Sequence, residues 1–349
     1  MSQVRFRNLD ALRGLCAVTV MLFHCDGLFT QGEIFCHGFL SVDVFFILSG
    51  FVLAHTYEDR LRTGLSASAF TRLRLKRLAP VYWTGTLLGA GMMAAIAAYR
   101  PEGTFFSPFL IVALSVMAML LIPQVTLGGS AYPANAAAWS LAGELIVNVL
   151  YARWFARWRT AALAGVIVCL WLTFTIVAFN SPYGWGLGGR STDVWWTPVR
   201  ALPAFLMGVV LFRAWRAGWF TRFPAISPII LLGIWVAITE VPTHGPLPAF
   251  EAATVTLVAP LLIVLLVRTP EVAPKPFLWL GAISYPLYAV HLSLVYLVRF
   301  TPLFGLDQAP SPWRAALVCA CVVLLGWIVH RLVERPRGFG WITARSTSA

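Results

Sequence analysis

Two ionisable side chains near the start of the chain, Arg13 and His24, have a spacing that suits chemistry inside a helix. They lie eleven residues apart, which at about 100° per residue returns to within about 20° of the same face and separates them by roughly 16 Å along the axis. A histidine titrates near neutral pH and can act as the general base that acyl transfer to a hydroxyl requires. A snorkelling arginine and a structural histidine are the alternative interpretation.

Other apolar stretches also carry polar side chains. Two of them follow the i, i+4, i+7 spacing that places side chains on one helix face, with Glu144, Asn148 and Tyr151 in one stretch and Ser284, Tyr288 and His291 in the other. Asp43 is a carboxylate inside an apolar run, so it requires a partner such as an arginine or a backbone amide. Interhelical hydrogen bonding alone explains either stripe, but stripes on several helices predict one polar interior cavity.

A basic cluster follows the second apolar run, where the sequence predicts a loop over residues 56–79. Arg72, Arg74 and Arg77 lie in it, and guanidinium groups bind phosphate oxygens in bidentate fashion. The cluster therefore suits the phosphates of a nucleotide-bearing substrate. A plain signal for membrane orientation is the other interpretation, because short cytoplasmic loops are usually basic.

These side chains must be positioned by membrane helices, because the 349 residues are 59% hydrophobic and only 11% charged. A crossing helix needs roughly 20 apolar residues. Eleven candidate segments fit, at residues 11–29, 34–55, 80–99, 105–123, 138–155, 160–179, 198–215, 226–241, 252–268, 277–299 and 313–333. The sequence predicts an all-α integral membrane protein with one domain over residues 1–349 and no separate soluble part. The net charge of +12 is spread over loops, so we expect no nucleic-acid partner.

The loop charges predict the membrane topology. The positive-inside bias places both termini, residues 56–79 and the loops near residues 153–159, 213–222 and 268–275 in the cytoplasm. Three candidate segments then lie between two cytoplasmic loops, where an even number must cross. We assign residues 105–123 as re-entrant or interfacial because that segment runs into a turn-rich loop. About ten crossings remain.

Several motifs together resemble acyltransferase family 3, membrane enzymes that O-acylate extracytoplasmic glycans and some small molecules. They occur in the family's order over nearly the whole chain, as NLDALRG at residues 8–14 followed by His24, GFLSVDVFFILSGF at 38–51, RLR at 72–74 with RLAPVY at 77–82, WSL at 139–141 with Glu144, GAISYPLY at 281–288 with His291, and ERP at 334–336. Each motif is weak alone, and their order makes the resemblance specific. The family often has two adjacent carboxylates in the mid-chain motif, whereas Gly143 and Leu145 flank Glu144 here.

The resemblance implies roles for particular residues. His24 corresponds to the family's essential histidine, and Arg72 with Arg74 to its acyl-donor motif, which Arg77 extends. Arg13, Asp43 and Glu144 are expected to support catalysis, and the cavity is expected to include Trp139, Ser140, Ser284, Tyr288 and His291. Direct transfer and an acyl-histidine intermediate both use His24.

The resulting functional hypothesis is O-acylation in a bacterial inner membrane. Acyl-CoA, with acetyl-CoA as the family's commonest donor, would supply the acyl group from the cytoplasm to a hydroxyl of an extracytoplasmic carbohydrate such as an exopolysaccharide or a lipid-linked glycan. We expect no metal and no bound cofactor beyond this donor, and the sequence leaves the acceptor and the oligomeric state open. The rival hypothesis is a transporter or flippase of a glycan precursor, for which matched inverted halves are typical; no matched halves are evident.

Overall fold

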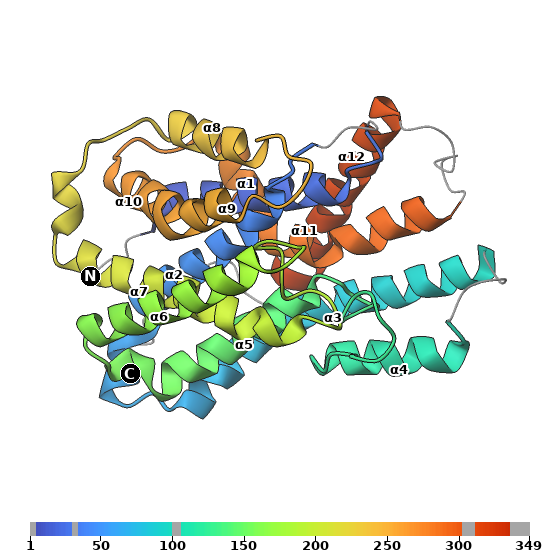
Figure 1. Ribbon diagram of the computed structural model, residues 1–349, viewed down its shortest axis with the longest axis horizontal. Helices are drawn as coiled ribbons and strands as arrows, with labels where there is room; N and C mark the ends of the chain where they lie inside the picture. The colour runs from blue at the N-terminus through green and yellow to red at the C-terminus, as the bar shows by residue number, and fades with distance from the viewer. Residues whose placement is uncertain (1–4, 30–33, 100–105, 302–310, 336–349) are drawn as a thin grey trace.

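A computed structural model describes residues 5–29, 34–99, 106–301 and 311–335 of the chain (Figure 1). The described residues form helices and connecting turns, and their only β-type pairing is an isolated bridge between Ser130 and Arg190. The predicted all-α membrane fold is therefore confirmed. The terminal segment from residue 336, which includes the last residue of the ERP motif and the predicted cytoplasmic C-terminus, lies outside the described residues.

All eleven predicted apolar segments coincide with helices. The elements are α1 (Arg7–His24), α2 (Ser41–Thr63), α3 (Ala67–Tyr99), α4 (Pro108–Met119), α5 (Ala138–Arg153), α6 (Thr160–Phe179), α7 (Thr197–Arg216), α8 (Pro228–Thr239), α9 (Pro248–Ala253), α10 (Ala259–Arg268), α11 (Lys275–Phe300) and α12 (Pro312–Val329). A π-helical turn at Thr254–Val258 joins α9 to α10, so these two helices make one segment.

Helix length separates spanning from short elements. Among the described residues, seven helical segments are long and apolar enough to cross a membrane. Helix α1 has 18 residues and α5 has 16, whereas α4 and α8 have 12 each. A helix of 12 residues is about 18 Å long, which is less than the roughly 30 Å of a hydrocarbon core. Helix α4 is the segment that the charge argument excluded from crossing.

The prediction of a loop over residues 56–79 is wrong. Helix α2 continues to Thr63, and α3 begins at Ala67. The break between them is short because Gly64, with φ of 146°, ends α2 in a conformation that favours glycine, and the Ser66 hydroxyl accepts a hydrogen bond from the Ala69 amide. The basic cluster therefore lies on the first turns of a 33-residue helix.

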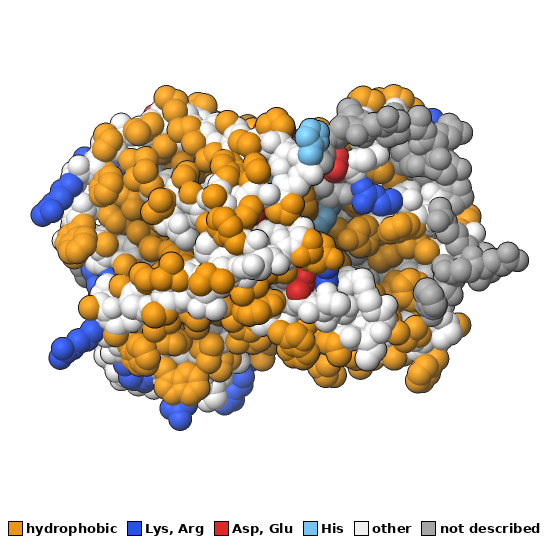
Figure 2. All heavy atoms as spheres, viewed as in Figure 1, with side chains coloured by type: hydrophobic (Ala, Val, Ile, Leu, Met, Phe, Trp, Pro, Cys, Tyr) orange, Lys and Arg blue, Asp and Glu red, His pale blue; other side chains and the backbone are white. Residues whose placement is uncertain are grey.

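Burial distinguishes inner helices from those that face lipid. The most apolar window of α2 is 72% buried, whereas those of α6 and α12 are 28% buried. Helix α1, which carries Arg7, Asp10 and Arg13, is an inner helix packed mainly against α11 and α2. Hydrophobic side chains cover most of the face shown in Figure 2, with basic side chains gathered at its left end. The inner position of α1 keeps its charged side chains away from hydrocarbon, as a membrane interior requires.

Two glycines allow α2 and α7 to pack at backbone contact. A Cβ atom on Gly50 would collide with the carbonyl of Phe205, and one on Gly208 would collide with the carbonyl of Ile47. Small residues at crossings let membrane helices approach closely. The contact brings two residues of opposite charge, described below, within hydrogen-bonding distance.

The loops predicted to be cytoplasmic meet at one end of the bundle. Phe6, before α1, packs edge-on against Trp215 at the end of α7, and Asn8 donates a hydrogen bond to the Glu271 carbonyl after α10. Arg62 at the end of α2 donates to the Ala156 carbonyl between α5 and α6. We call this end the basic end. His24, the last residue of α1, lies toward the opposite end.

Candidate active site

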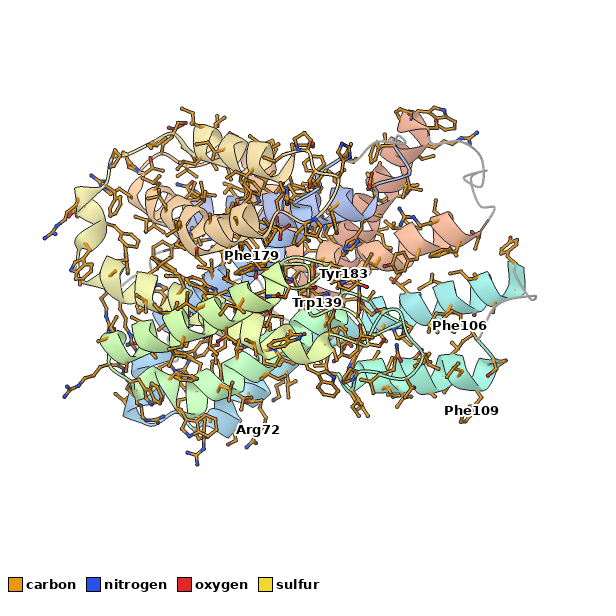
Figure 3. The ribbon with its side chains drawn as sticks, in the orientation of Figure 1. Arg72, Phe106, Phe109, Trp139, Phe179 and Tyr183 are labelled. Carbon is orange, nitrogen blue, oxygen red and sulfur yellow. The ribbon has the colours of Figure 1, made fainter. Side chains whose placement is uncertain are left out.

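A cavity of about 610 Å³ lies beside His24, at the end of α1 that points away from the basic end. Its wall includes His24, Trp139, Tyr288 and His291, all of which the sequence singled out. The loop between α4 and α5 meets the loop between α6 and α7 beside it, because the Ala131 amide donates to the Gly189 carbonyl. Figure 3 shows Trp139 and Tyr183 near the middle of the bundle, where both line this cavity.

Two histidines are neighbours in the cavity wall. The ring centroids of His24 and His291 are 5.3 Å apart. His291 Nδ1 lies 2.7 Å from the Tyr288 carbonyl oxygen, which only accepts hydrogen bonds, so Nδ1 carries the hydrogen. His291 Nε2 then holds the lone pair, and it is buried with no hydrogen-bond partner in the part of the chain that the structure describes. The pair thus offers one half-buried imidazole and a second imidazole in a fixed tautomer.

A polar contact across two helices fixes Tyr288. Its hydroxyl lies 2.7 Å from the Ser140 hydroxyl of α5, and Ser140 donates to the Ala137 carbonyl. Trp139 is the neighbour of Ser140 in sequence, and the Arg200 guanidinium lies 5.2 Å from its ring centroid. Cation–π contact of this kind favours a fixed ring, so α5 presents an ordered indole to the cavity.

Asp43 finds its partner in Arg200, which sequence reasoning missed. Arg200 donates from Nη2 to Asp43 Oδ2 at 2.6 Å and from Nε to Oδ1 at 2.9 Å, and both side chains are buried. Arg200 also donates to the Leu187 carbonyl. A charge in an apolar segment requires a partner. Arg200, at the start of the predicted 198–215 segment, is such a charge, so the reasoning that singled out Asp43 could also have found Arg200. Asp43 therefore supports the cavity wall from behind.

A second buried pair, His37 and Glu251, was also missed. Both residues line the cavity, and His37 Nδ1 lies 3.9 Å from Glu251 Oε1. Glu251 accepts hydrogen bonds from the amides of Trp185 and Leu247, whereas neither ring nitrogen of His37 has a hydrogen-bond partner among the described residues. Burial lowers the pKa of His37, so its ring is neutral at pH 7. Glu251 directly precedes the predicted segment 252–268, and His37 lies at the start of the predicted segment 34–55, positions where polarity looks ordinary in sequence.

Glu144 and Arg74 form a separate polar group nearer the basic end. Arg74 Nη2 donates to Glu144 Oε1 at 2.6 Å, and the Ser49 hydroxyl donates to the same oxygen at 2.9 Å. The contact joins α3, α5 and α2. Neither Arg74 nor Glu144 lines the large cavity, so the predicted residues do not all share one wall.

Arg13 belongs to this inner region as well. It donates from Nε to the Ser284 hydroxyl at 2.8 Å and from Nη2 to the Gly281 carbonyl at 2.7 Å. These bonds are short because α1 and α11 touch, since a Cβ atom on Gly14 would collide with the backbone of α11. Arg13 and His24 both face α11, as their spacing predicts, with Arg13 toward the basic end and His24 at the cavity.

The three predicted donor-binding arginines do not share one surface. Arg74 is buried, Arg77 is half-buried and Arg72 is exposed. Figure 3 shows Arg72 at the periphery of the bundle. The reason is helical geometry, because residues two apart on a helix point about 200° away from each other. Arg72 and Arg74 therefore cannot both bind the same phosphate group in this placement.

The fold and the cavity define a helical membrane protein with two neighbouring histidines in the wall of an internal cavity. A family model described as an acyltransferase domain matches residues 6–331, so the chain belongs to acyltransferase family 3 and is a membrane O-acyltransferase.

Curated relatives cover most of the chain. It is 23% identical to acyltransferase MdmB of Streptomyces mycarofaciens, over 95% of this chain and 92% of the relative. It is 26% identical to the exopolysaccharide production protein ExoZ of Rhizobium meliloti, over 90% and 94%. The peptidoglycan O-acetyltransferase OatA of Listeria monocytogenes is 22% identical over 94% of this chain, which spans 55% of OatA. No solved structure is significantly similar to the chain.

Proposed function

We propose that this protein transfers an acyl group, with acetyl as the simplest case, from cytoplasmic acyl-CoA to a hydroxyl of an extracytoplasmic carbohydrate. The observation that carries the proposal is the placement of His24 and His291, 5.3 Å apart, in the wall of a large cavity opposite the basic end. The names of ExoZ and OatA, which refer to exopolysaccharide and peptidoglycan, support a glycan acceptor.

The lining of the cavity suits a sugar. Tyr183, Tyr296 and Trp139 contribute aromatic rings, and Arg190 and Arg200 contribute hydrogen-bond donors. Aromatic faces pack against the C–H surfaces of a sugar ring, while a few placed polar groups fix its orientation. The volume of about 610 Å³ is large enough for more than one sugar unit or for one unit with an acyl thioester.

His24 is the proposed base. Its imidazole takes the proton of the acceptor hydroxyl as that oxygen attacks the thioester carbonyl. A new C–O ester bond forms, the C–S bond breaks, and the departing CoA thiolate receives the proton from the His24 imidazolium. The lone pair on Nε2 lets His291 accept a hydrogen bond from a second hydroxyl of the acceptor sugar and so orient it, while the Tyr288 hydroxyl is a donor for the developing oxyanion once it turns away from Ser140.

The donor is proposed to enter from the basic end, which the positive-inside bias assigns to the cytoplasm of a bacterial cell with this protein in its inner membrane. Arg77 is the proposed contact for the CoA phosphates, and the exposed Arg72, on another face of α3, is proposed to add only long-range attraction. The pantetheine arm would pass Arg74 and Arg13 toward His24. The roughly 16 Å rise between Arg13 and His24 matches the need for an extended arm.

Transfer is testable with the purified full-length chain in proteoliposomes. The probe is acetyl-CoA with a radiolabelled acetyl group, supplied with a panel of bacterial oligosaccharides. We expect label to enter oligosaccharide as an ester that mild base releases as acetate. Movement of unmodified oligosaccharide across the liposome membrane, without ester formation on any acceptor, would instead establish the transporter hypothesis.

A further inference from the structure

A second pocket, of about 490 Å³, opens at the basic end of the bundle, far from the histidines. We call it the arginine pocket, and its lining is Arg62, Arg157, Trp158, Arg159, Thr160, Arg213, Arg216 and Ala217. The residues come from the end of α2, the turn between α5 and α6, and the end of α7. Five guanidinium groups in one pocket create a strong positive potential, which attracts anions.

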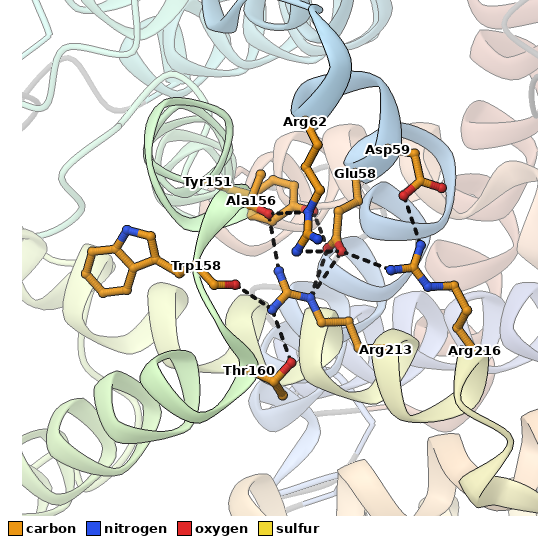
Figure 4. Close-up of polar contacts among 9 residues, drawn as sticks. All are labelled: Glu58, Asp59, Arg62, Tyr151, Ala156, Trp158, Thr160, Arg213 and Arg216. Atoms are coloured by element: carbon orange, nitrogen blue, oxygen red, sulfur yellow. Dashed lines mark hydrogen bonds and ion pairs between the residues drawn. The ribbon is translucent and has the colours of Figure 1, made fainter.

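One buried carboxylate organises these arginines (Figure 4). Glu58 is fully buried and accepts hydrogen bonds from Arg213 Nε and from the Tyr151 hydroxyl. Arg62 and Arg216 form ion pairs with the same carboxylate at 3.3 and 3.6 Å. Because Glu58 holds three arginine side chains in place, the pocket is ordered before any ligand binds.

The charges of the pocket remain unbalanced. Besides Glu58, the carboxylate that contacts these arginines is Asp59, which pairs with Arg216 and is 78% exposed. Arg157 donates to the backbone carbonyls of Leu61 and Ala152, which carry no charge. Arg159 has no side-chain hydrogen bond or ion pair with any residue that the structure describes. Two carboxylates therefore face five guanidinium groups.

The start of α6 adds to the preference for an anion. Arg159 precedes the helix, and no side chain caps its first turn, so the Thr160 and Ala161 amides lack helical partners, whereas those of Ala162 and Leu163 donate to the Arg159 carbonyl. Helix N-termini bind phosphate through such amides and through the helix dipole. Thr160 lines the pocket, so this helix end and the arginines converge on one space.

The surroundings place the pocket at a membrane surface. Trp154 and Trp158 are 50% and 41% exposed beside it, and tryptophans gather where lipid headgroups meet hydrocarbon. Helix α6, which starts at the pocket, leaves most of its surface open to lipid. An anion that reaches this level of the bilayer in high concentration is a lipid headgroup phosphate.

The acyl donor does not fit here. Behind the pocket, Leu61, Tyr151 and Ala156 are fully buried and belong to the main core, so packed side chains separate the arginines from the cavity of His24 in the described part of the chain. A thioester held at this pocket would stay outside the bundle. Basic pockets between membrane helices on the cytoplasmic side suit anionic lipid headgroups.

We propose that the arginine pocket binds the headgroup phosphate of an anionic phospholipid. The bound phosphate would link the ends of α2 and α7 to the α5–α6 turn. The site is independent of the acyl-transfer proposal.

The test uses the purified full-length chain in detergent, titrated with dioleoylphosphatidylglycerol and read by native mass spectrometry and thermal stability. The pocket variant is Arg157→Gln with Arg159→Gln. The control variant, Arg153→Gln with Arg222→Gln, removes the same charge from residues that do not line the pocket. We expect the apparent Kd to rise about tenfold or more in the pocket variant and less than twofold in the control. Arg159→Gln alone, which breaks no side-chain hydrogen bond or ion pair with the residues that the structure describes, should raise the apparent Kd about threefold.

Further ligands distinguish the sources of phosphate. Dioleoylphosphatidylcholine, inorganic phosphate and acetyl-CoA should each stabilise the unaltered protein far less than phosphatidylglycerol does. Equal stabilisation by inorganic phosphate would overturn the lipid assignment, and displacement of phosphatidylglycerol by acetyl-CoA would make the pocket a donor site. Equal losses in the pocket and control variants would show that only general surface charge attracts the lipid.

Discussion

Arg200 and Asp43, 157 positions apart in sequence, form a two-pronged ion pair in which both side chains are buried. The pair joins α7 to α2 behind the cavity wall. Arg200 also donates a hydrogen bond to the Leu187 carbonyl in the loop between α6 and α7. The position of this loop therefore depends on a charge inside the bundle.

Removing one member of this pair should destabilise the protein. Because an uncompensated charge would stay buried, Asp43→Asn should lower the free energy of unfolding by about 3–5 kcal/mol. Asp59→Asn, which removes an exposed partner of Arg216, is the control and should cost at most about 1 kcal/mol. Denaturant titration in detergent measures both. Equal effects of the two substitutions would contradict a structural role for the buried pair.

Loss of His24 should abolish acylation while the protein still inserts. A general base contributes about 10² to 10⁴-fold to the rate, so His24→Ala and the ring-preserving His24→Phe should both lower kcat by that factor. His55→Phe is the matched control because His55 packs among Phe6, Phe212 and Trp215 at the basic end. Near-normal ester formation by His24→Ala would make this residue a packing histidine.

The two arginines of the RLR motif should have unequal roles. Arg74 is bonded to Glu144, and Arg72 is exposed. The double substitution Arg72→Ala with Arg74→Ala should raise the donor KM and leave the acceptor KM unchanged. Arg74→Ala should account for most of the rise in donor KM, because it also leaves Glu144 without its cation. Arg72→Ala weakens only a solvated contact, so it should change the donor KM less than about threefold. Kinetics of the single variants would refute this assignment if Arg72 carried the larger share.

His37 should affect the acceptor rather than the donor. His37→Phe keeps a ring against Phe250, 4.8 Å away, but removes both ring nitrogens from the cavity wall. We expect a rise of about tenfold in the acceptor KM, equivalent to one hydrogen bond, at constant donor KM. Because burial lowers the pKa of His37, the neutral ring is the main form at pH 7 and above, so the acceptor contribution of His37 should change little from pH 7 to 8. A rise in the donor KM instead would contradict the assignment of His37 to acceptor binding.

Membrane orientation is testable with reporters. A reporter inserted near Ser66, in the short turn between α2 and α3, should read cytoplasmic, as should one fused after residue 349. The reason is that the predicted cytoplasmic loops gather at the basic end with Arg62, Arg157 and Arg213. A periplasmic signal at the C-terminus would instead require an odd number of crossings and would return residues 105–123 to the set of spanning segments.

The sequence alone determined which segments become helices, because a bilayer forces each apolar run to satisfy its backbone hydrogen bonds internally. It also determined the inward faces of those helices, since i, i+4, i+7 spacing fixes direction whatever the neighbours are. Tyr151 and His291 are buried as that spacing predicts. The motif order was likewise sufficient to identify the family.

Only the tertiary structure decided which polar groups meet. Arg200 reaches Asp43 because two glycines let α2 and α7 touch, and no local pattern encodes that crossing. The same packing separates Arg74 and Glu144 from the cavity of His24. His37 and Glu251 become neighbours because the turn before α2 packs against α9, with the His37 and Phe250 ring centroids 4.8 Å apart, which is a long-range relationship. Local composition sets the direction of a side chain, but its partner depends on which helices pack together.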